Sequence, residues 1–123
     1  MYITAAVLSV LLALASLAAG LPKAQLKGDV PAGLQSHMGL SAGLVRFIGL
    51  AELAAAVGLV VGLFWQPLGI AAAIGFAITM AGAIVFHTRA GDYANPETRN
   101  SSMAPIMLGL IAVAAAVTLT LAM

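Results

Sequence analysis

The sequence predicts an all-α membrane protein, a single bundle of four transmembrane helices. Of its 123 residues, 63% are hydrophobic and 7% are charged, whereas a soluble domain carries about a quarter charged residues. Four apolar segments, at residues 2–21, 43–64, 67–87 and 103–123, each have about the 20 residues that a helix needs to cross a bilayer. Because these segments take up most of the chain, we expect one membrane domain and no separate soluble one.

The first segment, residues 2–21, contains no charged side chain and would span about 30 Å as a helix. We expect this helix to end at Pro22. The following connection, residues 22–42, contains the stretch "VPAGLQSHMGL", for which two interpretations remain open. It is either a disordered linker or a short helix resting on the membrane surface, because Leu34 and Met38 have the i, i+4 spacing of one helical face.

The second and third segments are separated only by Trp65 and Gln66, so they are expected to form a tight antiparallel hairpin. Pro67 is well suited to the first turn of the third helix. A polar stretch, residues 88–102, leads to the fourth segment, which opens with two serine caps and with Pro105 near its start.

Small residues are dense in all four segments, as in "AELAAAVG" and "GIAAAIGFA". In lipid, helices associate by close packing through Gly, Ala, Ser and Thr, which favours a compact bundle. Gly58 and Gly62 form a GxxxG motif. This motif indicates packing within the chain more strongly than it indicates a homo-oligomer, because the whole chain is rich in Gly and Ala.

Outside the apolar segments, the charged residues lie in the two longer loops and not in the turn at Trp65. Short loops rich in Lys and Arg stay in the cytoplasm. Both long loops are therefore expected in the cytoplasm, and both termini outside. Trp65 and Tyr2 would then lie in the outer aromatic belt.

Composition also excludes several classes of function. The net charge of +1 is made by scattered residues and gives no basic stripe, which argues against a nucleic-acid binder. The absence of cysteine excludes a disulfide, a thiolate metal ligand and a dithiol redox pair. No second histidine stands at metal-ligand spacing, so we expect no metal site. We also find no phosphate-binding loop and no nucleophile elbow, so any redox role would need a borrowed cofactor.

An arginine and a glutamate interrupt the second apolar segment. By helical rise Glu52 lies about 18 Å from the outer end, near the bilayer midplane, where an acid needs a partner inside the bundle. Arg46 lies about 9 Å closer to the cytoplasm, and Gly49 between them leaves space for the guanidinium. We expect an Arg46–Glu52 ion pair, with Ser16 or Thr79 completing the hydrogen bonds. The glutamate is either a polar staple between helices or a proton, ion or headgroup site.

A polar cluster is expected at the cytoplasmic mouth of the bundle, above Glu52. His87 closes the third segment at about the depth of Arg46, and Lys23 ends the first segment at the same level. Each residue alone is explained as an interfacial anchor or as a cation at a helix end. Their convergence would instead indicate a binding site. The predicted ligand-binding residues are Lys23, Arg46, Glu52, His87, Arg89 and Asp92.

The run "RFIGLAELAAAVGLVVGLF", with a third segment that ends "GAIVFHTRAGD", resembles the DoxX-like family of small bacterial four-helix membrane proteins. Further shared features are a first helix ending in Gly-x-x-Lys and the Arg-x-x-Gly-x-x-Glu pattern. The resemblance covers essentially the whole chain and implies a multi-pass protein of the bacterial inner membrane. The family name comes from the membrane subunit of a quinone-linked thiosulfate oxidoreductase. Related proteins are linked to oxidative-stress complexes, and distant eukaryotic relatives act as receptor-assembly chaperones.

Three functions remain open. We favour a non-catalytic membrane subunit or assembly factor for another membrane protein, because the chain has no self-sufficient catalytic constellation. The alternative is a quinone- or lipid-handling component of a membrane oxidoreductase, in which Arg46, His87 and Glu52 hold a carbonyl or headgroup and move a proton. Direct thiosulfate chemistry by this chain is disfavoured, since it has no cysteine. A small-molecule or proton transporter is weaker still, because four helices offer little room for a pathway.

Overall fold

A computed structural model of the chain describes residues 1–122, and these residues form helices joined by turns and short loops, with no strand among them. Four of the helices are long and apolar enough to cross a membrane, which confirms the predicted all-α membrane fold. They are α1 (Tyr2–Gln25), α3 (Ala42–Val61), α4 (Gln66–Arg89) and α6 (Ala104–Leu121). The shorter elements are α2 (Asp29–Ser36), α5 (Pro96–Arg99) and the 3₁₀ helix η1 (Ser101–Met103).

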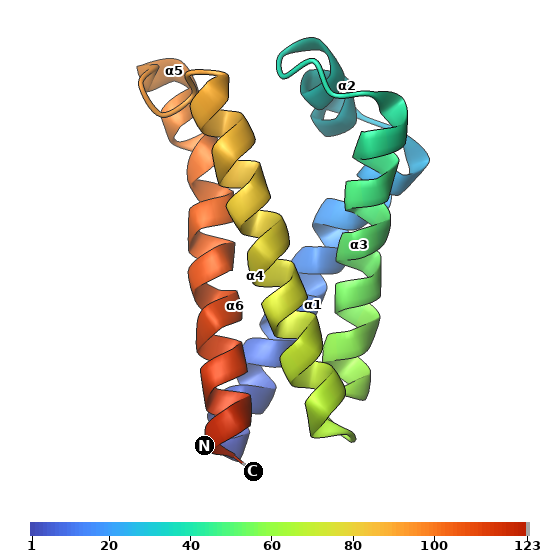
Figure 1. Cartoon of the computed structure of the whole chain (residues 1–123), viewed down its shortest axis with the longest axis vertical. Coiled ribbons are helices and arrows are strands. Elements are labelled where there is room, and N and C mark those ends of the chain that lie inside the picture. The colour runs from blue at the N-terminus through green and yellow to red at the C-terminus, as the bar shows by residue number, and fades with distance from the viewer. Residues whose placement is uncertain (123) are drawn as a thin grey trace.

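The four long helices alternate in direction (Figure 1). Both termini lie at one end of the bundle, here called the terminal end, and α2 and α5 lie at the opposite end, here called the loop end (Figure 1). Helix α1 packs on α3, α3 on α4, α4 on α6, and α6 on α1. The four helices therefore close a ring, as expected for a bundle with short connections.

The bundle is apolar both inside and outside. Its core is formed by buried side chains such as Leu12, Leu59, Phe76 and Met80. Large apolar side chains are also exposed on the outer surface of every long helix, which is what a lipid environment requires. Examples are Ile3, Phe47, Ile78 and Leu110.

Glycines set how closely the helices approach one another. A Cβ atom at Gly49 would lie 2.7 Å from the carbonyl oxygen of Gly20, so α1 and α3 touch through their backbones here. Near the Trp65 turn, Gly62 similarly abuts Gly69 of α4, and a Cβ at Gly58 would lie 2.8 Å from the side chain of Ala72. The GxxxG motif thus serves packing within the chain.

Helix α1 continues past Pro22, where it was predicted to end. The prolyl nitrogen removes only one hydrogen bond of the helix, and packing against Gly49 of α3 holds the next turn. The helix ends at Gln25, where Leu26 adopts a left-handed conformation and the backbone N–H of Lys27 donates to the carbonyl of Pro22. The other three long helices differ from their predicted bounds by three residues at most.

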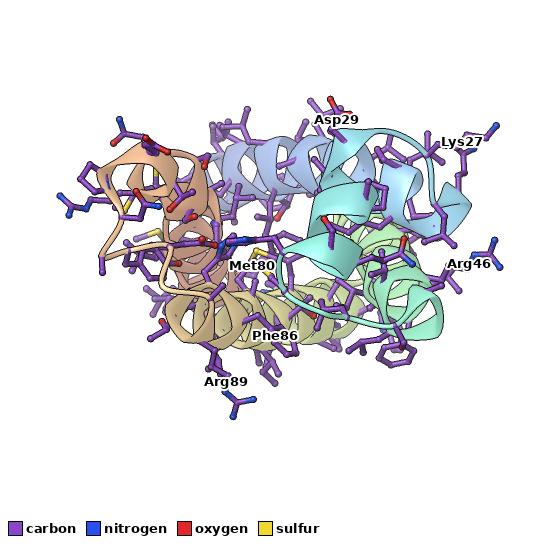
Figure 2. All side chains as sticks on the ribbon, turned by 90° about the horizontal axis from the view of Figure 1, so that it is seen from above. Lys27, Asp29, Arg46, Met80, Phe86 and Arg89 are labelled. Atoms are coloured by element: carbon purple, nitrogen blue, oxygen red, sulfur yellow. The ribbon has the colours of Figure 1, made fainter. Side chains whose placement is uncertain are left out.

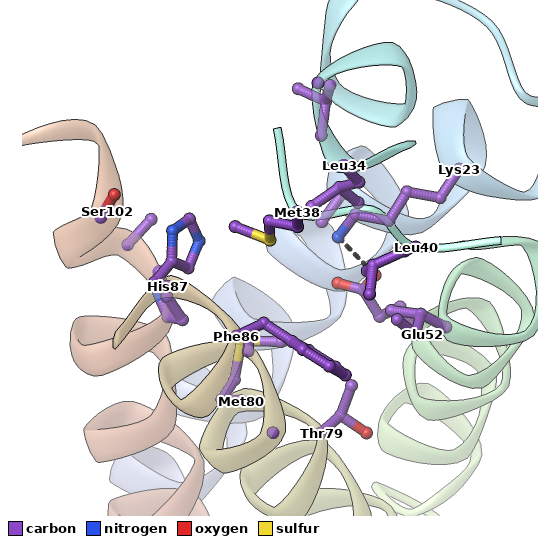
Figure 3. A pocket seen from close by; sticks show the side chains of 18 of the residues that line it. Lys23, Leu34, Met38, Leu40, Glu52, Thr79, Met80, Phe86, His87 and Ser102 are labelled. Atoms are coloured by element: carbon purple, nitrogen blue, oxygen red, sulfur yellow. Dashed lines mark hydrogen bonds and ion pairs between the residues drawn. The ribbon is translucent and has the colours of Figure 1, made fainter. Parts of the chain in front are cut away.

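The connection between α1 and α3 contains a short helix, α2, which confirms the helical interpretation over the disordered linker. Helix α2 contacts both α1 and α3, and it lies above the point where α1 ends (Figure 1). Leu34 and Met38 line the interior of the bundle (Figure 3). These two side chains therefore face the bundle, and the placement of α2 on the membrane surface stays a prediction.

Candidate functional site

The loop end of the bundle contains a cavity of about 620 Å³. It exists because α3 and α4 touch through glycines near the Trp65 turn and diverge toward the loop end (Figure 1). At Gly82, on the diverging part of α4, a Cβ atom would meet no other atom within 4 Å. The volume falls within the range of small-molecule sites, roughly 300–1,000 Å³.

Most of the cavity wall is apolar, and a few polar side chains are grouped in it (Figure 3). An apolar cavity with a few placed polar groups is the usual character of a site for a small organic ligand. Apolar lining residues include Leu40, Ile48, Met80, Phe86 and Leu108. The charged and histidine lining residues are Lys23, Asp29, His37, Glu52, His87 and Asp92.

The polar group deepest among these is an ion pair between α1 and α3. The Nζ atom of Lys23 lies 2.7 Å from Oε1 of Glu52. The Glu52 side chain is fully buried, and that of Lys23 is 14% exposed. The two residues meet because each lies opposite the glycine of the other helix. A Cβ atom at Gly20 would lie 2.9 Å from Cβ of Glu52, and one at Gly49 would lie 2.8 Å from Cβ of Lys23. The last turn of α1 therefore brings Lys23 beside Gly49 of α3.

The predicted Arg46–Glu52 pair is wrong. Arg46 is exposed and its side chain points away from the bundle (Figure 2). The space beside Gly49 is not free for a guanidinium, because the backbone of α1 at Gly20 and Ala24 occupies it. Gly49 thus acts as a helix contact, and the partner of the glutamate comes from another helix.

The hydroxyl partners predicted for Glu52 are also wrong. Ser16 donates to the carbonyl of Leu12 at 2.8 Å, and Thr79 donates to the carbonyl of Gly75 at 2.9 Å. Both hydroxyls are therefore satisfied by the preceding turn of their own helix. Oε2 of Glu52 has no hydrogen-bond partner among residues 1–122.

A second polar group, His37–Asp92–His87, lies nearer the loop end. One carboxylate oxygen of Asp92 lies 2.7 Å from Nε2 of His37, and the other lies 2.6 Å from Nδ1 of His87. An ionised carboxylate only accepts hydrogen bonds, so each histidine carries a proton on the nitrogen that faces it. The group links the connection after α2 to the connection after α4. Sequence reasoning missed His37, which lies 55 residues from its partner.

The local backbone fixes Asp92 in this position. Helix α4 ends in a turn in which Gly91 has a φ of 77° and the backbone N–H of Asp92 donates to the carbonyl of His87. The hydroxyl of Thr98 donates to the carbonyl of Asp92 at 2.8 Å. Burial opposes ionisation of the carboxyl, but the hydrogen bonds and charges of His87 and His37 outweigh it. The pKa of Asp92 is therefore below its ordinary value.

The lowered pKa of Asp92 makes a prediction for Asp92→Asn. Because the folded chain favours the ionised form, Asp92 contributes stability above its unfolded pKa, and this contribution is lost as pH falls through the folded pKa. At pH 7 we expect the variant to be less stable by about 1–2 kcal/mol. The difference should shrink below about pH 4. Thermal unfolding in detergent at both pH values measures it, and a constant difference would contradict the assignment.

Four of the six predicted site residues therefore line one cavity: Lys23, Glu52, His87 and Asp92. The other two do not. Arg46 and Arg89 are both exposed and point outward from the bundle (Figure 2). Their positions agree with the alternative interpretation, in which a cation near a helix end anchors the helix at the interface.

Comparison with known protein families matches residues 7–115 to the DoxX-like family. No curated protein and no solved structure matches the chain. The matched residues include the Lys23–Glu52 pair, both histidines and Asp92, so the whole polar lining of the cavity falls within the family's shared region. Since the match extends over most of its length, the chain belongs to the DoxX-like family.

Proposed function

We propose that the protein binds an amphiphilic small molecule of the lipid or quinone class in the cavity at its loop end. The observation that carries this proposal is the composition of the cavity wall, which is largely apolar and has a buried Lys23–Glu52 pair set in it. The apolar part suits a hydrocarbon chain or an unsubstituted ring face. The ion pair suits one polar head, because charged hydrogen-bonding groups hold a ligand in one orientation.

The position of the cavity also favours a ligand that comes from the bilayer. Phe47 and Leu44 of α3 line the cavity and are also exposed on the outer surface of the bundle. The cavity therefore reaches the lipid-facing side of α3, where α3 and α4 diverge (Figure 1). An apolar molecule dissolved in the membrane can enter along this side without crossing water.

Filling the cavity should strongly weaken binding. At Gly82 and at Gly75 of α4 a Cβ atom would meet nothing within 4 Å, but only Gly82 lines the cavity. We expect Gly82→Leu to lower the amount of amphiphile that co-purifies with the protein at least roughly tenfold, because the leucine occupies the ligand's volume. Gly75→Leu, the matched control, should retain it. Mass spectrometry of lipid extracts from protein purified in mild detergent makes the measurement.

Equal amounts of amphiphile in the two variants, or none with the unmodified chain, would contradict the proposal. A stoichiometric protein partner in the same preparation would instead support the accessory-subunit role that the sequence favours. Such a role and ligand binding are compatible, because a subunit can hold a quinone or lipid for a catalytic partner.

We also propose that the protein lies in the bacterial inner membrane with both termini outside. An active cytoplasmic reporter fused after Met123 would contradict this orientation.

A further inference from the structure

The buried carboxylate of Glu52 has one oxygen that the protein leaves without a partner. Oε1 is bound by the Lys23 ammonium at 2.7 Å. Oε2 is buried and has no hydrogen-bond partner among residues 1–122. In the close view the free oxygen points into the cavity, toward the space between Met38 and Phe86 (Figure 3). Buried acceptors in proteins nearly always accept a hydrogen bond. This oxygen accepts none from the described chain, so a donor on a ligand would complete it.

No other side chain that lines the cavity has a buried polar atom without a hydrogen-bond partner in the described chain. His37, His87 and Asp92 bind one another, and Thr79 donates to its own helix. The remaining buried side-chain atoms without a partner in the described chain are the hydroxyls of Ser9 and Tyr93, and neither residue lines the cavity. The requirement for a donor is thus specific to Glu52.

The ion pair narrows the chemistry of that donor. The paired charges largely cancel for a head of either sign, because attraction by one partner is offset by repulsion from the other, so the pair favours neither a cationic nor an anionic head. A carbonyl, ester or ether head only accepts hydrogen bonds, so it would leave Oε2 unsatisfied. A neutral hydroxyl satisfies both partners, because its O–H donates to Oε2 and its oxygen accepts from the N–H groups of Lys23 that remain.

We infer that the ligand is an apolar molecule with a neutral hydroxyl head, an alcohol or a phenol, whose O–H donates to Oε2 of Glu52. This inference rests on the proposed function. Lys23 positions this carboxylate and keeps it available as an acceptor. The apolar body lies against Leu40, Met80 and Phe86, which surround the pair in the cavity (Figure 3). The cavity thereby distinguishes a hydroxyl-bearing amphiphile from one with the same body and no donor.

A matched pair of probes tests this inference on the full chain. Tritiated 4-octylphenol is bound to the protein in lipid nanodiscs and is displaced by unlabelled 4-octylphenol or by 4-octylanisole, which differs only in the methylated oxygen. Only the phenol can donate a hydrogen bond to the charged carboxylate. We therefore expect 4-octylphenol to displace the label at a concentration at least roughly tenfold lower than 4-octylanisole does. Competition separates the site from simple partition into lipid.

Two variants connect the preference to the ion pair. In the double variant Lys23→Met, Glu52→Met both charges are removed together, which avoids leaving one of them buried alone. The phenol and the anisole should then compete equally. Arg46→Gln is the control, because it removes a charge from the same helix outside the cavity. It should keep the preference of the unmodified chain.

Each outcome decides between the inferences. Equal competition by the two probes on the unmodified chain would overturn the hydroxyl inference and leave the proposed amphiphile site standing. A preference that survives in the double variant would show that Glu52 is not the acceptor. The absence of saturable binding by the labelled phenol would overturn the hydroxyl inference, and the proposed function would fall with it if no amphiphile co-purified with the unmodified chain.

Discussion

Replacing Gly49 by alanine is expected to destabilise the bundle by about 1–3 kcal/mol, which is the usual cost of overpacking. The new Cβ would lie 2.7 Å from the carbonyl oxygen of Gly20 and 2.8 Å from Cβ of Lys23, and it would also meet the backbone nitrogen of Ala24. Two of these three atoms are backbone, so no side chain can rotate to relieve the clash. Helix α1 must move away from α3, and unfolding in detergent by heat or by SDS titration measures the loss.

The control for Gly49→Ala is Gly75→Ala. Gly75 also lies inside a long helix, but a Cβ there would meet nothing within 4 Å. Since alanine favours the helix over glycine by about 1 kcal/mol, this variant should be as stable as the unmodified chain or more stable. Destabilisation of similar size in both variants would show that glycine itself is required in these helices, and that the α1–α3 contact is not the reason.

The four long helices could be predicted because their signal is local. Length, apolar composition and the absence of charge decide a transmembrane helix within its own segment. The predicted end of α1 at Pro22 is wrong for a different reason. Packing on α3 and the turn at Leu26 extend the helix past this proline. A tertiary contact thus overrode the local tendency of proline to end a helix.

The pairing of Glu52 could not be predicted from position along one helix. Depth along a single segment favours Arg46 as the partner, whereas the real partner depends on how α1 crosses α3. One signal in the sequence was available. Gly20 precedes Lys23 by the same three residues by which Gly49 precedes Glu52. In an antiparallel pair of helices, placing Gly20 opposite Glu52 also places Gly49 opposite Lys23, because the two spacings are equal, and the lysine then lies within reach of the glutamate.

The His37 contact and the cavity depend on the tertiary structure more strongly still. His37 reaches Asp92 because α2 folds back over the end of α1 (Figure 1), and no local pattern around His37 encodes this. The cavity arises because α3 and α4 touch near their turn and separate toward the loop end. The mean hydropathy of α3 is 2.1 and that of α4 is 2.2, so this quantity does not distinguish the two helices or indicate where they diverge.

Removal of either partner of the Lys23–Glu52 pair is expected to have the largest effect on stability of any single change at the site. Glu52→Gln leaves the Lys23 ammonium without its carboxylate, and Lys23→Met leaves a fully buried carboxylate without a cation. Loss of one partner from a buried ion pair costs about 3–5 kcal/mol. Because Lys23 is 14% exposed and can reach water when unpaired, we expect Lys23→Met to cost more than Glu52→Gln.

The double variant Lys23→Met, Glu52→Gln should cost clearly less than the sum of the two single changes, since it leaves no unpaired charge in the bundle. The coupling energy from this cycle, measured by unfolding in detergent, reports the contact between α1 and α3 directly. Arg46→Leu provides the comparison, because an exposed residue without such a partner should change stability by about 0.5 kcal/mol or less. A strictly additive Lys23–Glu52 cycle, or strong coupling between Arg46 and Glu52 in the same assay, would contradict the ion pair and restore the partner expected from the sequence.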